Sequence, residues 1–247
     1  MNLQVDAAHP AVIARLLHDY DLHPKKSAGQ NFFCDGQQLD AIVDAAGIAP
    51  QDWVLEIGPG LGALTQRLAA RAARVVAVEL DKGLLAPLAQ TVGDMENVQI
   101  VNADFLKLCD DALDALLASA PGLRVVSNLP YCITTDAMQK LFLSRLPIQS
   151  ITVLVQREAA QRICALPGSK QYGVTAMMCA YYTQAKTVCS VPPQSFFPRP
   201  NVESVVMDFR FRSPRPCAEC PQEFIWRVAR GVLSMRRKTI FNNLCAA

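Results

Sequence analysis

Three glycines at alternate positions, Gly58, Gly60 and Gly62, are the first residues whose types and spacing indicate chemistry. They follow an apolar run at 53–57 and precede an apolar-periodic segment, which together predict a strand, a tight turn and a helix. Glycine lets the backbone pass close to a ligand where a Cβ atom would collide, and the helix expected to begin near Leu61 offers unpaired backbone amides. The turn therefore predicts a nucleotide-type ligand site.

The residues around the turn leave two ligands open. Gly58-x-Gly60-x-x-Ala63 also fits the dinucleotide fingerprint, and Glu79 lies near the roughly 20-residue spacing expected of a ribose-binding acid. Glu56, however, places a carboxylate two residues before the first glycine, where dinucleotide folds usually carry an apolar residue. A carboxylate repels a pyrophosphate but suits the sulfonium and ammonium groups of S-adenosylmethionine. Glu56 thus favours S-adenosylmethionine, with a purely structural turn as the alternative to any ligand.

An acid or an amide follows each of the next three predicted strands. The strands and these residues are 74–78 with Glu79, 98–101 with Asp104, and 123–127 with Asn128. Since the carboxyl ends of parallel strands form one edge of a sheet, where α/β ligands bind, we expect these side chains to lie together. Glu79 can accept hydrogen bonds from both ribose hydroxyls, and Asp104 can accept one from an adenine amino group. A helix-capping role is the alternative for Glu79.

Asn128-Leu129-Pro130-Tyr131 follows the fourth predicted strand and indicates the chemistry more specifically. An amino group on a nucleobase is a poor nucleophile because its lone pair is delocalised into the ring. Backbone and amide carbonyls can hold both amino hydrogens, which favours an sp³-like nitrogen with its lone pair directed at a methyl group. An adjacent aromatic ring stacks on the base. The motif therefore predicts methyl transfer to a base amino group.

Composition and the placement of cysteine and histidine argue against several other classes. Hydrophobic residues make up 51% and charged residues 19% of the 247 residues, which argues against long disorder. The nine cysteines are odd in number and scattered, so we expect reduced thiols. The Cys217 and Cys220 pair lacks a second pair or a nearby histidine, and we predict no metal site. All three histidines fall within residues 1–23 without a nucleophile motif, which argues against a hydrolase.

The distribution of charge and of apolar residues bears on partners and location. No apolar run reaches the roughly 18 residues of a membrane span, and the amino terminus lacks a signal peptide, so we expect a cytoplasmic protein without membrane contact. Net charge is +2, but residues 199–247 contain nine Lys or Arg and four Asp or Glu, a balance of +5. This asymmetry suggests contact with a polyanion. A solvated helix face is the equal alternative.

The chain length allows one α/β domain of about 200 residues and a smaller appendage. Besides the strands above, we predict helices at 1–23, 36–46 and 156–165 and a helix that Thr134 or Thr135 caps and that runs through Phe142. Further strands are expected at 151–155 and 205–211, with strand-forming sequence at 174–191. A basic binding loop at 23–33, a linker at 213–221 and a helical tail at 222–244 complete the chain. The proline-rich stretch 192–200 is stiff, and we expect it to present the ring of Phe196. A buried phenylalanine is the alternative.

A series of motifs gives the chain a resemblance to a known family. They are Gly29-Gln30-Asn31-Phe32, Glu56-Ile57-Gly58-Pro59-Gly60, Glu79-Leu80-Asp81, Asp104, Asn128-Leu129-Pro130-Tyr131, Gln156-Arg157-Glu158, Ser169-Lys170-Gln171-Tyr172-Gly173, Phe196-x-Pro198-x-Pro200-x-Val202-x-Ser204 and Arg236-Arg237-Lys238-Thr239. Over residues 26–244 the chain resembles the ribosomal RNA adenine N6-dimethyltransferases of the KsgA or RsmA type. That type modifies two adjacent adenines near the 3′ end of small-subunit rRNA.

The resemblance implies S-adenosylmethionine as the cofactor and a role for each matching residue. The implied cofactor contacts are Asn31, Phe33, Gly58, Gly60, Glu79, Asp104 and Asn128. The implied catalytic residues at the target base are Asn128, Leu129, Pro130 and Tyr131, with Phe196 on the other face of the base. The expected RNA-binding residues are Lys25, Lys26, Arg236, Arg237 and Lys238. The related Erm methylases of large-subunit rRNA share the first half, but the tail at 236–244 is similar to the small-subunit type.

The chain departs from the family pattern at three residues and at its end. Ala28 replaces the aromatic residue usual before Gly29, and Phe33 stands where leucine is common, so we expect different packing of the cofactor loop. Cys132 takes the place of an asparagine and puts a thiol beside the site. The chain ends at Ala247, some tens of residues before the family's helical domain normally ends, so we expect a shortened helical domain.

These inferences combine into one expectation. We expect an N-terminal helical extension at 1–23, a Rossmann-like α/β methyltransferase domain at 24–212 and a basic helical C-terminal domain at 213–247. The predicted reaction is in-line transfer of methyl groups from a sulfonium to adenine N6, twice on the same nitrogen. The expected partner is small-subunit rRNA in a pre-assembled ribosomal subunit, and the protein is expected to be a monomer. The alternatives are an Erm-like methylase, a dinucleotide-dependent oxidoreductase and a non-catalytic RNA-binding factor.

Overall fold

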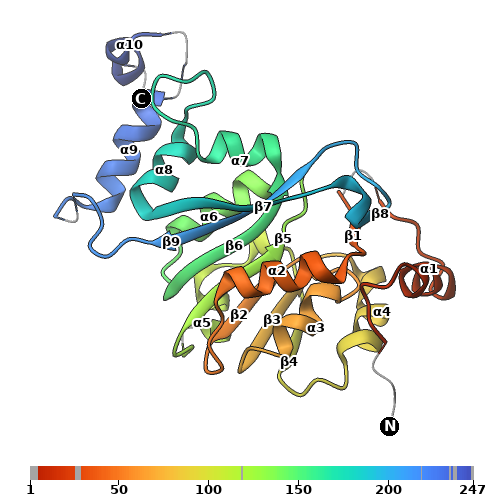
Figure 1. Cartoon of the computed structure of the whole chain (residues 1–247). Helices are drawn as coiled ribbons and strands as arrows, with labels where there is room; N and C mark the ends of the chain where they lie inside the picture. Colours follow the sequence, from red (N-terminus) through yellow and green to blue (C-terminus); the bar gives the residue numbers. More distant parts are fainter. Residues whose placement is uncertain are drawn as a thin grey trace.

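A computed structural model of the protein describes residues 5–25, 29–117, 119–217, 219–233, 235 and 238–245. Its centre is a seven-stranded sheet of order β4-β3-β2-β5-β6-β9-β7 (Figure 1). The strands are β2 (Trp53–Ile57), β3 (Arg74–Glu79), β4 (Val98–Asn102), β5 (Leu123–Asn128), β6 (Ile148–Gln156), β7 (Thr183–Val191) and β9 (Ser204–Phe211). Neighbouring strands from β4 to β6 pair in parallel, whereas β9 is antiparallel to both β6 and β7. The predicted Rossmann-like α/β fold class is confirmed.

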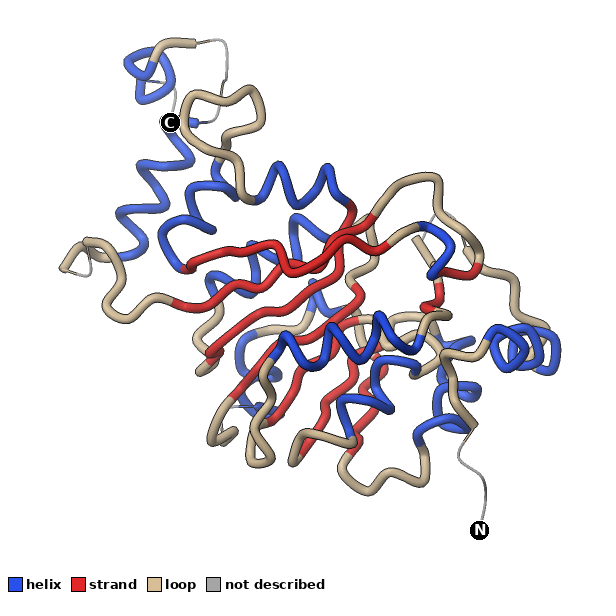
Figure 2. The backbone as a smooth tube through the Cα atoms, in the orientation of Figure 1, coloured by secondary structure: helices blue, strands red, loops and turns tan. Residues whose placement is uncertain are grey.

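Helices cover both faces of the sheet, as Figures 1 and 2 show. They are α1 (Pro10–Asp19), α2 (Gly36–Ala46), α3 (Ala63–Ala69), α4 (Lys82–Val92), α5 (Asp110–Leu117), α6 (Thr134–Leu143), α7 (Arg157–Ile163), α8 (Val174–Tyr182), α9 (Gln222–Leu233) and α10 (Ile240–Cys245). Two short 3₁₀ segments, η2 (Phe105–Lys107) and η3 (Pro193–Ser195), lie in loops.

Alternation of apolar side chains along the strands divides the core in two. Val54 and Val75 pack with α2 and α3, whereas Leu55 and Val76 pack on the opposite face with α5 to α9. Both faces of a central parallel strand are buried, so these strands have continuous apolar runs rather than alternation of apolar and polar residues. The antiparallel β9, Ser204–Phe211, confirms the strand predicted at 205–211.

Local signals account well for α2, which has the predicted bounds. Asp35 caps the helix, since its carboxylate accepts a hydrogen bond from the amide of Gln38 at 3.2 Å. Gly47 ends the helix in the left-handed conformation with a φ of 59°, which glycine adopts at little cost. The first predicted helix is shorter than the segment 1–23, because only 10–19 form α1 and the described residues before His9 run as an extended segment with a turn.

One prediction along the second half of the chain is wrong in detail. The stretch 174–191, predicted to form strands, divides into helix α8 and strand β7. Its first half contains Ala and Met, which are strong helix formers, and it packs against α6 and α7. The helical tail predicted at 222–244 is helical and consists of α9 and α10.

One edge of the sheet carries an irregular strand. β7 lies at the edge next to β9, and its pairing register shifts between Thr187 and Cys189. Side chains along the middle of β7, including Gln184 and Lys186, are exposed. A separate two-stranded sheet forms from β1 (Phe32–Phe33) and β8 (Phe196–Phe197), with Phe33 opposite Phe196.

Candidate active site

A cavity of about 410 Å³ lies at the carboxyl ends of β2, β3, β4 and β5. The parallel pairing of these strands brings their ends to one edge of the sheet, as the sequence predicted. The cavity is lined by most predicted site residues, namely Lys25, Asn31, Phe33, Gly58, Gly60, Glu79, Asp104, Asn128, Leu129, Pro130 and Tyr131. Residues up to 106 positions apart in the chain thus share one site.

The glycine turn needs glycine at each of its three positions. Gly58, Gly60 and Gly62 have φ values of 72°, 61° and 88°. A Cβ atom on Gly58 would lie 3.0 Å from the Pro130 side chain, and one on Gly62 would lie 2.6 Å from Thr91 Oγ1. The turn therefore joins β2 to α3 in a conformation that L-residues rarely adopt, while the backbone stays open to the cavity.

Glu56 is a fully buried acid in the wall of the cavity. Its Oε2 atom has no hydrogen-bond partner in the described part of the chain. Burial raises the pKa of Glu56 to about 8; a contact with the Thr65 side chain lowers it in part, and the nearby Glu79 carboxylate contributes to the rise. A buried carboxylate without a partner is costly unless a cation neutralises it. This site therefore fits a cationic ligand and does not fit a pyrophosphate.

Glu79, at the end of β3, is held by backbone amides on both carboxylate oxygens. Oε2 accepts from Gly60 N at 3.2 Å, and Oε1 accepts from Asp81 N at 2.7 Å. Burial raises the pKa of the Glu79 carboxyl. The N-cap of α4 is Asp81, whose side chain accepts from Gly83 N at 3.1 Å. Glu79 is thus not the helix cap, and its carboxylate is oriented into a cavity-lining position.

Asp104 follows β4 and begins the 3₁₀ segment η2. Its Oδ1 accepts from Leu106 N at 3.0 Å, and its Oδ2 lies 3.5 Å from Lys107 Nζ. Lys140 of α6 donates to the carbonyl of Leu106 at 3.1 Å and so ties the loop to the next helix. The carboxylate keeps lone pairs for a ligand because each oxygen has one contact.

Asn128 and Leu129 end β5 beside the loop that carries Asn31. The Asn128 side-chain amide donates to the Asn31 carbonyl at 3.3 Å, which leaves its amide oxygen as the accepting group of that side chain. The Pro130 carbonyl accepts from Ile133 N and from Thr134 Oγ1, so it is engaged by the turn that begins α6. Thr134 is the first residue of α6 and does not cap it, contrary to prediction.

Tyr131 is half-buried, and its ring is held at both ends. Its hydroxyl lies 2.9 Å from Ser204 Oγ, the first residue of β9. Its backbone amide lies against Gly29, where a Cβ atom would be 3.1 Å from Tyr131 N. Burial raises the pKa of the Tyr131 phenol. The sequence predicted a stacking ring at this position but gave no sign of the serine partner.

Phe196 does not line the cavity, so the expectation that the proline-rich loop presents this ring is wrong. Its side chain is 3% exposed, and its ring centroid lies 4.8 Å from that of Phe33. Pairing of β1 with β8 places Phe33 opposite Phe196 on one face, against the apolar cluster of α2 and α3. The next residue, Phe197, points to the other face and is 43% exposed.

The expected RNA-binding residues have different outcomes. Lys25 pairs with Asp81 at 2.7 Å on the rim of the cavity, where Gln30 also donates to Asp81 at 2.8 Å. Burial alone would raise the pKa of Asp81, but the contacts from Lys25 and Gln30 lower it overall. Lys238 is exposed before α10. Lys26, Arg236 and Arg237 lie outside the described residues.

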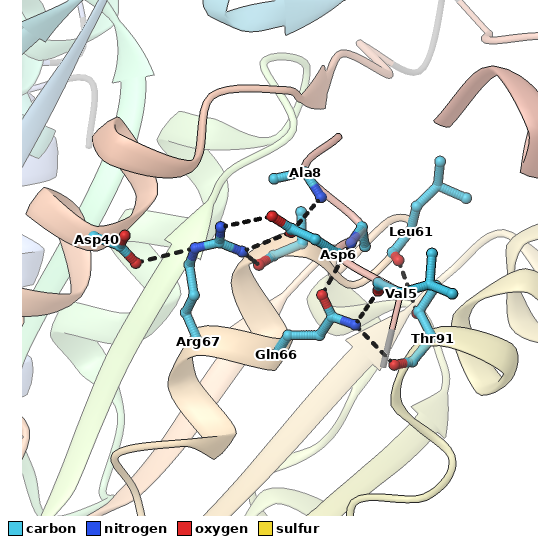
Figure 3. A network of polar contacts seen from close by, with 10 residues as sticks. Val5, Asp6, Ala8, Asp40, Leu61, Gln66, Arg67 and Thr91 are labelled. Atoms are coloured by element: carbon cyan, nitrogen blue, oxygen red, sulfur yellow. Dashed lines mark hydrogen bonds and ion pairs between the residues drawn. The ribbon is translucent and has the colours of Figure 1, made fainter. Parts of the chain in front are cut away.

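The amino-terminal segment also contributes to the cavity, which the sequence did not indicate. Figure 3 shows Gln66 of α3 as the centre of a polar network around this segment. Its side chain accepts from Ala7 N at 3.0 Å and donates to the carbonyls of Val5 and Thr91, both at 2.9 Å. Ala7 lines the cavity. Gln66 lies on the face of α3 opposite to Leu64 and Leu68, so the apolar pattern of this helix gave no sign that its side chain is buried.

The same network reaches the glycine turn. Thr91 Oγ1 donates to the Leu61 carbonyl at 2.9 Å, and Arg67 pairs with Asp6 and Asp40 at 3.2 and 3.1 Å (Figure 3). Helix α1 then packs Ile13, Leu16 and Leu17 against an apolar cluster that includes Leu61. The amino-terminal segment is therefore part of the wall that positions the turn.

Other classes of site find little support in the described residues. Within them, no group of three or more His, Cys, Asp or Glu side chains could hold a metal ion, and no helix is long and apolar enough to cross a membrane. None of the nine cysteines, each within the described ranges, forms a disulfide bond.

Known proteins are similar in sequence to nearly the whole chain. Ribosomal RNA small subunit methyltransferase A of Geobacillus thermodenitrificans is 44% identical over 240 residues, which are 97% of this chain and 82% of that protein. The protein of the same name from Moorella thermoacetica is 42% identical over 243 residues, 96% of this chain and 84% of that protein.

Solved structures support the same fold. The 23S rRNA methyltransferase ErmE is 26% identical with a TM-score of 0.69, covering 87% of this chain and 84% of that chain. A dimethyladenosine transferase from Plasmodium falciparum has a TM-score of 0.71 at 24% identity, covering 85% and 73%. The ribosomal RNA adenine dimethylase family matches residues 22–246. Since this match spans most of the sequence and the relatives are similar over nearly all of it, the chain belongs to the ribosomal RNA adenine dimethylase family.

Proposed function

We propose that the protein uses S-adenosylmethionine to dimethylate the N6 amino groups of two adjacent adenines near the 3′ end of small-subunit rRNA. The observation that carries the proposal is one cavity shared by the acids Glu56 and Glu79 and by the motif from Asn128 to Tyr131. The acids suit a cationic nucleoside, and the motif suits a base amino group. The names of the relatives, which specify the small ribosomal subunit, support the choice of substrate.

The residues present fit this cofactor. Glu56 is a buried acid whose Oε2 lacks a partner among the described residues, and it can offset the cofactor's positive charge. Glu79 is oriented by two amides and can accept from the ribose diol. The left-handed glycines at 58 and 60 leave room for close approach of the backbone. When bound, S-adenosylmethionine supplies an electrophilic methyl group on a sulfonium.

The protein's own groups prepare the base for transfer. The Asn128 amide oxygen can accept an amino hydrogen, because its amide nitrogen is already engaged by Asn31. Withdrawal of the amino group from the ring plane restores a localised lone pair on nitrogen. The ring of Tyr131 stacks on the base and limits its orientation. Orientation of the base amino group towards the methyl group accelerates methyl transfer without requiring a metal or a histidine base.

The partners follow from the same proposal. The protein acts on small-subunit rRNA within a pre-assembled ribosomal subunit, as a cytoplasmic monomer. The positive balance of residues 199–247 supports contact with a polyanion, with Lys238, Arg236 and Arg237 as its basic centre. The boundaries at 23 and 212 divide the proposed methyltransferase domain from the extension and the helical tail.

The Erm-like alternative has one observation in its favour, the similarity to ErmE at 26% identity. The small-subunit relatives are more similar, at 42 to 44%. Mapping dimethyladenosine in rRNA from cells with and without this gene tests both functions. Loss from small-subunit rRNA supports the proposal, whereas loss from large-subunit rRNA supports the alternative. Unchanged methylation of both would indicate a non-catalytic RNA-binding factor. A gene copy encoding Tyr131→Ala is the matched control for catalysis.

A further inference from the structure

Ser204 is a buried polar residue that the reaction scheme above does not use. It has no exposed surface and is the first residue of β9, placed between β6 and β7 in the sheet. Its pairing partners are Gln156 on one side and Val191 on the other. Its backbone is therefore fixed from both sides, and its hydroxyl lies at the carboxyl end of the neighbouring β6, the edge that carries the cavity.

The residues before Ser204 are fastened separately to the same edge. The Glu203 carbonyl accepts from Arg157 N at 3.0 Å, and the Glu203 carboxylate pairs with the Arg157 guanidinium at 2.7 Å. Arg157 also donates to Ser190 Oγ at 3.0 Å. Because the start of β9 is held by these contacts, the backbone of Ser204 has a fixed position that does not depend on Tyr131.

The Tyr131 ring reaches this fixed point from the end of β5. The two hydroxyl oxygens are 2.9 Å apart, although the residues are 73 positions apart in the chain. A tyrosine side chain has two torsion angles, and the hydroxyl oxygen lies on the axis of the second, χ2. An anchor on the hydroxyl therefore restricts χ1, and with it the direction of the ring, when the backbone is also fixed. Gly29 packs against the Tyr131 backbone at the other end. The direction in which the ring extends is thus set from two sides.

We propose that Ser204 is a positioning residue that fixes the χ1 angle of Tyr131 and so keeps its ring where it can hold the target base. The inference rests on the proposed function, since Tyr131 is assigned there to the base. Ser204 is not among the residues that line the cavity. It acts through the phenol alone, so its effect requires the hydroxyl of Tyr131.

Four variants test this: Ser204→Ala, Tyr131→Phe, the double variant, and Ser150→Ala as a control. Ser150 is also fully buried, on β6 opposite Arg210, at the far end of the β6–β9 pair from Ser204. Single-turnover methylation of small-subunit particles with labelled cofactor gives the rate. We expect about tenfold slower transfer with Ser204→Ala, a change of about 1.4 kcal/mol, and a similar loss with Tyr131→Phe. Ser150→Ala should stay within about twofold of the unmodified protein.

The double variant decides between positioning and general stability. If Ser204 acts through the phenol, Ser204→Ala causes no further loss in the Tyr131→Phe background. Losses that multiply in the double variant would overturn the proposal, as would an unchanged rate with Ser204→Ala. In steady state, kcat should fall while KM for the particle stays within about twofold. Cofactor affinity should also be unchanged.

A measurement without substrate separates this inference from the proposed function. Nuclear magnetic resonance of labelled tyrosine reports, through three-bond couplings to Cγ, the χ1 rotamer populations of Tyr131. Ser204→Ala should spread Tyr131 over more than one χ1 rotamer and Ser150→Ala should not. If the unmodified protein does not methylate the particle, the proposed function fails, yet the rotamer populations still decide whether Ser204 holds Tyr131. Equal χ1 populations in both serine variants would reject the anchor.

Discussion

The apolar residues near the two ends of the described chain differ in burial. Near the amino end, Ile13 has no exposed surface and packs with Leu61 of the glycine turn. Near the carboxyl end, Ile240 and Phe241 of α10 are 61% and 74% exposed. Helix α9 reaches the main core through Trp226, whose indole donates to the Tyr182 hydroxyl at 2.9 Å. One end is built into the wall of the cavity, and the other is attached beside it.

This difference shows which parts of the chain the cofactor site depends on. Ala7 lines the cavity and is held by the Gln66 side chain of α3. None of the described residues of α9 and α10 lines it. The amino-terminal segment should therefore affect stability and cofactor binding together, whereas α10 should affect RNA binding without affecting either.

The largest expected effect tests the two ends directly. Ile13→Ala should lower the free energy of unfolding by about 2–5 kcal/mol, because it leaves a cavity in a fully buried cluster. The matched variant Phe241→Ala should change it by no more than about 0.5 kcal/mol, since that ring is largely exposed. Urea unfolding measures both. Equal losses at the two sites would break the comparison.

The effect of the amino-terminal segment on cofactor binding can be compared with the effect of Glu79, which we propose contacts the cofactor directly. Glu79→Gln should weaken S-adenosylmethionine binding by about 1–3 kcal/mol, the range for a lost charged hydrogen-bond partner. Ile13→Ala should weaken it less, because it acts only through the turn. Calorimetric titration gives both values. Unchanged affinity with Glu79→Gln would contradict the assignment of Glu79 to the ribose.

Glu56, in the wall of the cavity, should make the free energy of unfolding depend on pH. Burial raises the pKa of Glu56 from 4.5 to about 8, so the folded protein keeps a proton that the unfolded chain loses. That stabilisation is complete below about pH 4.5 and is lost as pH rises towards about 8. The slope is about 1.4 kcal/mol per pH unit for one proton. Glu56→Gln should flatten it in cofactor-free protein.

Denaturation measured at several pH values between 5 and 8 decides this point. Glu79, whose pKa is also raised by burial, remains in both proteins and supplies a common background. Phe241→Ala should keep the full slope, because α10 lies outside the cavity. An identical slope in Glu56→Gln and in the unmodified protein would show that another group titrates.

The smallest expected effect on cofactor binding is at the carboxyl end. Replacing Arg236, Arg237 and Lys238 together by alanine should leave S-adenosylmethionine affinity unchanged. It should reduce the slope of RNA affinity against salt by roughly two to three units on a log–log plot, one for each lost phosphate contact. Filter binding at several salt concentrations measures the slope. An unaltered slope would assign these residues to a solvated helix face.

The cavity's centre could be predicted from sequence because its determinants are local. The glycines at 58, 60 and 62 and the polar residues after β3, β4 and β5 each follow an apolar run, and parallel strands bring such positions to one edge. The same rule placed Glu79, Asp104 and Asn128 together before any contact was known.

What the sequence could not predict depends on distant contacts. Phe196 is buried because β8 pairs with β1, which lies 163 positions earlier at Phe33. The Tyr131 hydroxyl meets Ser204, and Lys25 meets Asp81, through loops whose paths no local pattern encodes. The helix α8 forms within a stretch predicted as strand, where Val, Thr and Tyr are mixed with the helix formers Ala and Met and local propensity does not decide.

The irregular edge strand β7 has a consequence for solubility. An exposed strand edge offers unpaired backbone groups to another chain, and such edges lead to aggregation unless they are protected. The register shift between Thr187 and Cys189 distorts this edge, and the exposed Lys186 would have to approach a second copy of itself in an edge-to-edge dimer. A sheet that ends in this way resists extension by neighbouring molecules at the concentrations reached during synthesis.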